Sequence, residues 1–451
     1  MTATIWLFAI GQLGWSILAG LVSNWLVYFY QPSAESIDVG QLLYVPQGRV
    51  VLGVLTIIGV ITAVGRIFDA FTDPWIANKS DRSTNPKGRR IPFMRKVAIP
   101  FAAVTTLVFM APVKSISGIN TAWLLVTLLL FYLCMTIYCT PFNALIPIIG
   151  SDQKSRIAVS TAISLTFIVG TALAYLAPVI WGALTPSMGR VTAMRTTFGA
   201  MSAFACICLL VPTFAIDERK LGEFTPTKEN AFASLKITFG NKDFRTFVYS
   251  DVLYFTALTI FQTGLPFFVT SLMGLKESDS SLLFVMMTGL SLLWYPLVNK
   301  LAPKFGKKKL VRIAFLIFTF TYILTALSGI FVQGKLSWGI MIVAFASISM
   351  AILGILPQAM VADVAEEDSV LSGTNRDGMF FAARTFAFKM GQSLAMLIFT
   401  AFAASGVIGY RMAAITAAVL CVLANLALVR YDEKRILKVC MEHESQLKAA
   451  D

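Results

Sequence analysis

Twelve long apolar runs dominate the sequence, and each is long enough to cross a lipid bilayer as a helix. The hydrocarbon core requires roughly 17–25 apolar residues per helix, and it leaves only helices or closed barrels with a satisfied backbone. The pattern therefore predicts an all-α membrane protein with twelve transmembrane helices. To within a few residues, the runs fall at 5–30, 50–77, 97–113, 121–149, 157–181, 196–216, 246–273, 281–299, 313–333, 337–361, 378–404 and 411–430.

The composition agrees with a membrane protein, because 57% of the 451 residues are hydrophobic and only 14% are charged. Soluble domains are about half apolar and a quarter charged. The six cysteines have no disulfide-framework spacing, and the only histidine, His443, lies near the C-terminus. The chain therefore lacks material for a histidine-based metal site or a Ser-His-Asp triad. We expect no enzyme activity and no cofactor beyond a coupling ion.

The runs form two sets of six, separated by the longest polar segment. We predict an N-terminal half at 1–216, a linker at 217–245, a C-terminal half at 246–430 and a tail at 431–451. The first run has no charge from Ile5 to Tyr30 and no basic residue before it, so it is predicted to be a retained helix rather than a cleaved signal peptide.

The basic residues predict the orientation, since cytoplasmic loops of membrane proteins are enriched in Lys and Arg. If both termini are cytoplasmic, the inward loops and the tail, with Arg430 included, hold 27 of the 37 Lys and Arg residues. This distribution accounts for the net charge of +13 without a nucleic-acid partner. We expect a monomer in the cell (inner) membrane. The outward loops hold seven basic residues: Arg49, Lys114, Arg190, Arg195, Lys276, Lys335 and Arg411.

Two basic loops occupy matching places in the two halves. Residues 78–96 follow the second predicted helix of the first half, and residues 300–312 follow the second helix of the other half. A loop that recurs after the same helix is expected of parallel repeats. The arrangement resembles the major facilitator architecture, with twelve helices in two six-helix halves.

Three charged residues lie inside the second predicted helix. Asp69 and Asp73 are four residues apart, so their carboxylates lie on one face of the helix, and Arg66 is three residues before Asp69. Charges inside the bilayer are costly and usually functional. The excess negative charge predicts a bound cation or a protonated carboxyl. The alternative is structural: Arg66 pairs with one aspartate, and the other pairs with another helix.

Other polar groups inside the runs are candidates for the same site. Lys389 lies mid-span, where it can either answer the negative charge of the second helix or act as a packing counter-ion. Thr136 can offer a hydroxyl oxygen to a cation. We expect Arg384 to contact the acidic segment 363–377 and Asp251 to be solvated near the cytoplasmic end.

A longer motif around these residues resembles a known family. The stretch Arg66-x-x-Asp69-Ala70-x-Thr72-Asp73-Pro74, followed by Asp81-Arg82 and Gly88-Arg89-Arg90-x-Pro92, is similar to the signature of glycoside–pentoside–hexuronide:cation symporters. It also resembles sodium-dependent lysophospholipid symporters. The resemblance implies a site for Na⁺ or H⁺ at Asp69, Thr72, Asp73 and Thr136, with Arg66 and Lys389 as coupling residues. We expect Gly88, Arg89 and Arg90 to act as a gating loop that governs conformational exchange.

The charged sugar contacts of that family have no counterpart here. The family's helix 1 aspartate falls near Leu13 or Gly14, its helix 4 aspartate and tryptophan fall on Cys139 and Asn143, and its helix 5 arginine falls near Ser164. Cys139 and Asn143 remain candidate substrate contacts. Neutral amides could still hold a polar solute, namely Gln12, Asn24, Asn143, Gln262, Gln358 and Gln392.

The sequence thus predicts a cation-coupled secondary transporter that works by alternating access and symports a small organic solute. By resemblance the substrate is a sugar or glycoside, and the alternative is a lysophospholipid or another amphipathic solute. An alternative of a different class is a non-transporting membrane receptor or scaffold, which would need no buried carboxylate pair. The expected partners are the substrate, the coupling cation and the lipid bilayer.

Overall fold

The computed structural model describes residues 2–83, 85, 88–150, 153–220, 238–330, 336–373 and 377–450, and helices account for most of them. The α-helices are α1 (Thr2–Tyr30), α2 (Ala34–Asp38), α3 (Ile57–Asp81), α4 (Ile91–Val108), α5 (Gly118–Ile149), α6 (Gln153–Tyr175), α7 (Ala177–Met188), α8 (Arg190–Ala215), α10 (Lys242–Phe267), α11 (Glu277–Phe305), α12 (Lys307–Ala326), α13 (Leu336–Ser372), α14 (Asp377–Ala403), α15 (Gly406–Leu428) and α16 (Glu433–Ala450). A 3₁₀ turn, η1 (Glu218–Lys220), follows α8, and a π-helical turn, η2 (Phe268–Leu272), extends α10.

The prediction of an all-α membrane protein is confirmed. Within the described residues, eleven segments are long and apolar enough to cross a membrane, and α6 with α7 forms one of them. The helix α3 corresponds to the one predicted span that is not among these eleven. It carries the charges Arg66, Asp69 and Asp73 within its apolar stretch. Most of the predicted tail at 431–451 is helical as well, because it contains α16.

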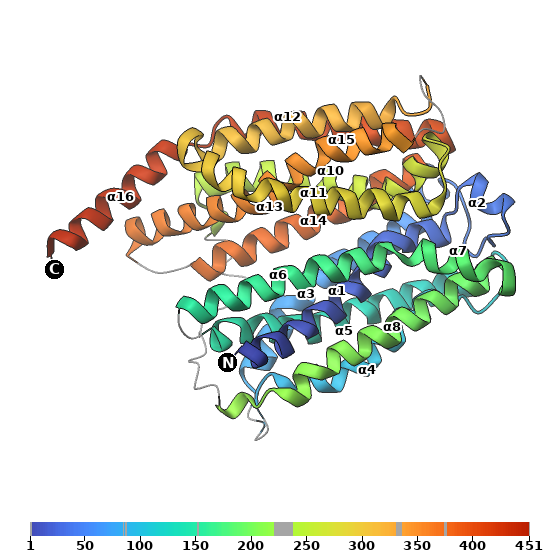
Figure 1. The fold of residues 1–451 in the computed structure, drawn as a ribbon, viewed down its shortest axis with the longest axis horizontal. Coiled ribbons are helices and arrows are strands. Elements are labelled where there is room, and N and C mark those ends of the chain that lie inside the picture. The colour runs from blue at the N-terminus through green and yellow to red at the C-terminus, as the bar shows by residue number, and fades with distance from the viewer. Residues whose placement is uncertain are drawn as a thin grey trace. The chain divides into compact units, whose positions relative to one another are not determined.

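The chain divides into two compact units. The first comprises residues 1–227, 263–285 and 396–409, and the second comprises 228–262, 286–395 and 410–451. Within the first unit α1 packs against α6 and α8, α4 packs against α5 and α8, and α3 packs against α5 (Figure 1). The units therefore do not follow the boundary expected at 217–245, and the two six-helix sequence halves stay a prediction.

The helix α3 has two opposite faces. Its exposed apolar side chains, Val64, Ile67, Phe71 and Trp75, recur every three to four residues and form one stripe. At about 100° per residue, Arg66, Asp69 and Asp73 project from the opposite side. Lipid can cover the apolar stripe while the charged residues face protein.

The start of α3 differs from the prediction of a helix from residue 50. Residues 50–56 form a turn closed by a bridge between Val51 and Leu55, with Leu52 and Gly53 both at positive φ. The helix begins at Ile57, where the Thr56 side chain caps it by accepting from the Gly59 amide. A residue in the left-handed conformation cannot continue a right-handed helix. The prediction from apolar residues alone therefore began this helix too early.

The two basic loops have the same local structure. In the first, the Glu218 carboxylate accepts the backbone amides of Arg90 and Ile91 at the start of α4. In the second, Glu433 accepts those of Lys307 and Lys308 at the start of α12. A glycine at positive φ precedes each helix, Gly88 at 111° and Gly306 at 84°. A carboxylate at a helix N-terminus satisfies free amides and the helix dipole, so the recurrence seen in the sequence has a shared physical role.

Candidate functional site

The carboxylates of α3 meet a hydroxyl of α5. Thr136 Oγ1 lies 3.0 Å from Asp69 Oδ1 and 3.1 Å from Asp73 Oδ1. Thr72 Oγ1 lies 3.3 Å from Thr136 Oγ1 and donates to the Asp69 carbonyl at 3.1 Å. The structure thus brings together the four residues that the resemblance implied, and it gathers two carboxylates and two hydroxyls around one point.

The two carboxylates share one hydroxyl of α5. A threonine hydroxyl has a single proton to donate, so Thr136 cannot donate to both carboxylates at once. Asp69 is fully buried and Asp73 is half-buried, so water screens the pair poorly. A cation or an added proton between these oxygens would relieve the repulsion.

A glycine makes the close approach of α3 and α5 possible. A Cβ atom at Gly65 would lie 2.6 Å from the ring of Tyr132. Small residues let membrane helices approach closely. Arg66, next in sequence, donates to Ser23 Oγ at 3.0 Å and lies 5.3 Å from the centre of the Tyr132 ring. Arg66 therefore connects α3 to both α1 and α5.

Two candidate substrate residues share the helix face of Thr136. Cys139 and Asn143 follow Thr136 by three and seven residues on α5, which places all three on one side of the helix. Cys139 is half-buried and Asn143 is exposed. These side chains therefore lie one and two turns from the carboxylate pair.

Gly14, one of the two positions near which the family's helix 1 aspartate falls, is a packing contact. A Cβ atom at Gly14 would lie 2.8 Å from the Ala205 carbonyl oxygen and 3.0 Å from the Cys208 Cβ on α8. An acidic side chain would not fit there without moving the two helices apart. Gly14 is therefore a contact residue of α1 and α8.

The remaining predicted substrate and coupling residues lie in the second unit. Lys389 on α14 is buried, with 9% of its surface exposed. Gln392, three residues later on the same face, has a buried side-chain oxygen that accepts no hydrogen bond from the residues that the structure describes. Gln262 on α10 is half-buried and Gln358 on α13 is exposed. Lys389 and Gln392 thus offer a cation and an acceptor side by side.

Two expectations about charged residues were wrong. Arg384 forms a two-pronged ion pair with Asp251, at 2.7 Å to Oδ2 and 3.2 Å to Oδ1, rather than with the described residues of segment 363–377. Asp251 is only 3% exposed at its side chain, so it is not solvated. The segment also begins within α13, which continues to Ser372. Burial of opposite charges is tolerated when they pair with good geometry. Both residues lie near the cytoplasmic ends of their predicted helices, and this similar depth in the membrane could have indicated the pair.

The expected gating loop is partly buried. Arg89 is exposed and Arg90 is buried, and the Cβ of any residue at Gly88 would clash with the Glu218 carboxylate. Gly88 therefore allows the close approach of Glu218 to the α4 amides.

The donor set at α3 and α5 suits a hard cation. Within the part of the chain that the structure describes, no three His, Cys, Asp or Glu side chains gather as for a transition metal. The site instead offers only carboxylate and hydroxyl oxygens, from Asp69, Asp73, Thr72 and Thr136. Hard cations prefer such oxygen ligands.

Comparisons with known proteins agree with a transporter. Residues 7–430 match the model of a family described as MFS/sugar transport protein. The chain is 25% identical to a putative glycoside/cation symporter of Escherichia coli, over 75% of this chain and 72% of that one. It is 23% identical to sodium-dependent lysophosphatidylcholine symporter 1 of Xenopus tropicalis, over 74% and 70%. A bacterial homologue of the lysosomal transporter Spinster has the same fold, with a TM-score of 0.67, 15% identity and 97% of both chains covered.

Proposed function

Because the chain belongs to the MFS/sugar transport family and is therefore a cation-coupled transporter of the major facilitator fold rather than an enzyme, we propose that Asp69 and Asp73 bind its coupling cation. The observation that carries this proposal is the single Thr136 hydroxyl within hydrogen-bonding distance of both carboxylates. Thr72 and Thr136 supply the neutral oxygens. Cation binding lets the two carboxylates lie together, and the transporter then changes the side to which the site opens.

The cation that fits this donor set is Na⁺. All four candidate ligands are oxygens, and two neutral hydroxyls accompany the two carboxylates. A proton would need only one carboxylate and would leave the hydroxyls without a role in binding. Na⁺ is here a co-substrate, released in each cycle.

The test compares Asp73→Asn with the parent protein in proteoliposomes. The variant loses one negative charge, so Na⁺-driven uptake is expected to stop and Na⁺ affinity to fall by at least about tenfold. Asp38→Asn, at an exposed carboxylate of α2, is the matched control and is expected to behave as the parent does.

Three results of this experiment are informative. Na⁺-driven uptake that persists in Asp73→Asn would reject the carboxylate pair as the coupling site. Uptake that follows a pH gradient alone, and stops in Asp73→Asn, would keep the site but assign it to H⁺. Thermal stabilisation of the purified protein by Na⁺ but not K⁺ would support Na⁺, since a ligand stabilises the state it binds.

For the substrate we infer an amphipath with one anionic or strongly polar head. Lys389 and Gln392 can bind such a head, while the positions that would bind sugar hydroxyls carry no charged side chain, and Gly14 is used for packing. Unpaired hydroxyls of a buried sugar would be costly. A sugar or glycoside is the second candidate, favoured by the similarity to a glycoside/cation symporter.

Competition separates the two substrate classes. The thermal stability of the purified protein is measured with members of a disaccharide panel and of a lysophospholipid panel, singly and in competition. The ligands are at equal concentration, below the critical micelle concentration, and Na⁺ is present. We expect lysophospholipids to bind better than melibiose and other simple disaccharides. A sub-millimolar disaccharide site that does not respond to lysophospholipid would reject the amphipath.

The remaining parts of the proposal concern placement in the cell. We propose a monomer in the cell (inner) membrane with both termini in the cytoplasm, supported by the distribution of Lys and Arg. We also propose that the sequence halves 1–216 and 246–430 alternate access to the site, with 217–245 as their linker.

A further inference from the structure

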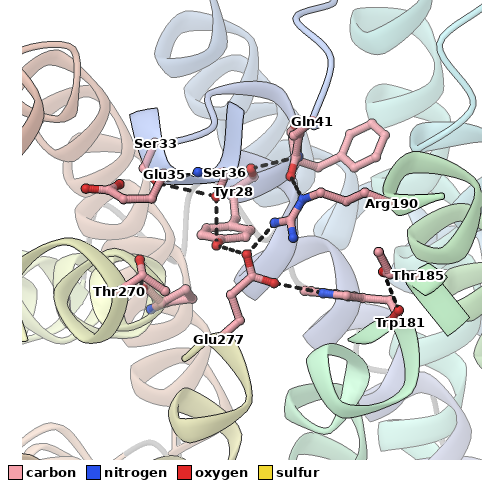
Figure 2. Close-up of polar contacts among 12 residues, drawn as sticks. Tyr28, Ser33, Glu35, Ser36, Gln41, Trp181, Thr185, Arg190, Thr270 and Glu277 are labelled. Carbon is pink, nitrogen blue, oxygen red and sulfur yellow. Dashed lines mark hydrogen bonds and ion pairs between the residues drawn. The ribbon is translucent and has the colours of Figure 1, made fainter. Parts of the chain in front are cut away.

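A glutamate at the start of α11 is held by three donors from three other helices of the first unit. Glu277 accepts hydrogen bonds from Tyr28 on α1 at 2.5 Å and from the Trp181 indole on α7 at 2.9 Å. It also pairs with the guanidinium of Arg190, the first residue of α8. Figure 2 shows these side chains converging on one carboxylate. We call Tyr28, Trp181, Arg190 and Glu277 the Glu277 clamp.

The surrounding residues fix the donors in place. Gln41 accepts from Arg190 Nε at 3.0 Å and donates to the Phe29 carbonyl at 3.0 Å. Ser36 of α2 donates to the Tyr28 hydroxyl at 2.9 Å. Arg190 and Tyr28 are therefore oriented before they meet Glu277, and such preorganisation strengthens a charge-assisted contact.

The clamp separates a cavity from a dry layer. A cavity of about 600 Å³ is lined by Glu35, Arg190, Lys276, Glu277 and their neighbours. The Glu277 side chain is 19% exposed and that of Arg190 7%, so Glu277 retains some contact with solvent. Beyond the clamp, Tyr175 stacks on Phe284 with ring centres 3.5 Å apart, beside the fully buried Trp25.

We propose that the Glu277 clamp is a gate of the transporter. It closes the first unit at the end where α2 lies. The clamp ties α11, from the C-terminal part of the sequence, to α1, α7 and α8, from the N-terminal part. Alternating access requires such ties to break in each cycle. The inference rests on cation-coupled transport, and it adds the residues that close this side of the protein.

The partial exposure of Glu277 makes a reversible gate possible. A charge pair that is fully buried is very costly to separate, because each ion loses its partner without gaining water. Here the cavity can hydrate Glu277 once Arg190 releases it. The aromatic layer has no charge to rehydrate, and it can part when α11 moves.

The test measures labelling of a thiol placed behind the clamp. Ser281 lies one turn beyond Glu277, is 1% exposed, and donates to the Tyr175 carbonyl. Ser281→Cys reports opening through its reaction with a membrane-impermeant thiol reagent. The exposed position Ser187→Cys identifies the membrane side from which the reagent reaches the clamp. The same variants without the added cysteine give the background, which is small at Cys440 because burial raises the pKa of that thiol to about 11.

Glu277→Gln is the principal variant. The amide retains the size of the side chain, but it loses the charge that holds Arg190. Its NH₂ group cannot accept a hydrogen bond, so only one end of the side chain remains an acceptor. We expect labelling of Ser281→Cys to become at least about tenfold faster, equivalent to 1.4 kcal/mol. Asp279→Asn is the matched control, since Asp279 is an acid of the same helical turn and accepts the Lys276 amide rather than a donor of the clamp. This variant is expected to leave the labelling rate unchanged.

Two outcomes would overturn the gate. One is an unchanged labelling rate in Glu277→Gln, and the other is an equal increase in Asp279→Asn. If Glu277→Gln does not fold, Tyr28→Phe and Trp181→Phe each remove one hydrogen bond and keep a ring, and each is expected to raise labelling a few-fold. Parental rates in both ring variants would then reject the clamp. Labelling needs no transport, so a failure of Na⁺-driven uptake in the parent would be seen separately.

Discussion

At the scale of single residues, Thr136 joins the two aspartates of α3. Its hydroxyl is the shared neighbour of Asp69 and Asp73. The resemblance pointed to Thr136, but only the packing of α5 against α3 placed it there.

Replacing this hydroxyl tests the site without changing its charge. Thr136→Val keeps the shape of the side chain and removes one oxygen. A hydrogen bond to a charged group contributes roughly 1.5–3 kcal/mol, so Na⁺ affinity is expected to fall about tenfold or more, measured by Na⁺-dependent stabilisation of the purified protein. Thr127→Val, at a buried hydroxyl that bonds only within α5, is the control. Equal Na⁺ affinity in the two variants would remove Thr136 from the site.

The ion pair of Arg384 and Asp251 is also a feature of individual residues. The guanidinium contacts both carboxylate oxygens, and the two side chains are 8% and 3% exposed. The rings of Phe247 and Phe255 lie within 6 Å of the guanidinium, at 5.9 and 5.7 Å. This setting leaves either ion without water if its partner is removed.

We therefore expect the single variants to be less stable than the double variant. Arg384→Met or Asp251→Leu alone should cost about 3–5 kcal/mol, since each leaves an uncompensated buried charge. The double variant should recover most of that loss, as measured by thermal unfolding in detergent. Additive losses would show that the two residues act independently.

At the scale of helices and loops, the starts of α4 and α12 share a carboxylate cap. Glu218 and Glu433 each bind two backbone amides next to a glycine at positive φ. Each cap comes from the segment after the last long helix of its sequence half. Each therefore fastens that segment to the third helix of the same half.

This geometry supports a role of the basic loop in movement rather than binding. Arg89→Ala is expected to slow uptake several-fold while leaving the half-saturating substrate concentration unchanged, because Arg89 is exposed at the start of α4. Arg82→Ala, at another exposed position after α3, is the control. The measurement is initial uptake rate against substrate concentration in proteoliposomes. Altered affinity with an unchanged maximal rate would contradict the prediction.

At the scale of the whole molecule, contacts and sequence divide the chain differently. The first unit contains residues 1–227 together with 263–285 and 396–409. The two additional segments come from the C-terminal part of the sequence and include Glu277. The contacts of the Glu277 clamp, which join this C-terminal segment to α1, α7 and α8, accord with that division.

The basic residues predict how the molecule lies in the membrane. With 27 of 37 Lys and Arg in the inward segments, a fluorescent reporter fused after Asp451 should fluoresce in the cytoplasm. A periplasmic phosphatase at the same position should be inactive. The reverse pattern of the two fusions would invert the proposed topology, and with it the side that the Glu277 clamp closes.

The sequence by itself determined the helical membrane fold and most of its helices. Within a bilayer each helix must satisfy its own backbone and offer apolar side chains to lipid, so this information is local. The charged face of α3 was equally visible, because the spacing of Asp69 and Asp73 fixes their relation on any helix. Local boundaries failed where a turn interrupted apolar residues, as at 50–56 before α3, and where a helix continued past its apolar run, as α13 does to Ser372.

Only the tertiary structure decided which distant groups meet. Arg384 pairs with Asp251, 133 residues away, and Glu277 meets Tyr28 across 249 residues. A charge inside the membrane must find a partner, but its sequence does not name that partner, since several groups of opposite charge lie at similar depths. Helix packing selects among them. The assembled helices bring one carboxylate within hydrogen-bonding distance of the donor, and this carboxylate offsets the desolvation of the donor. The others are too far away to do so.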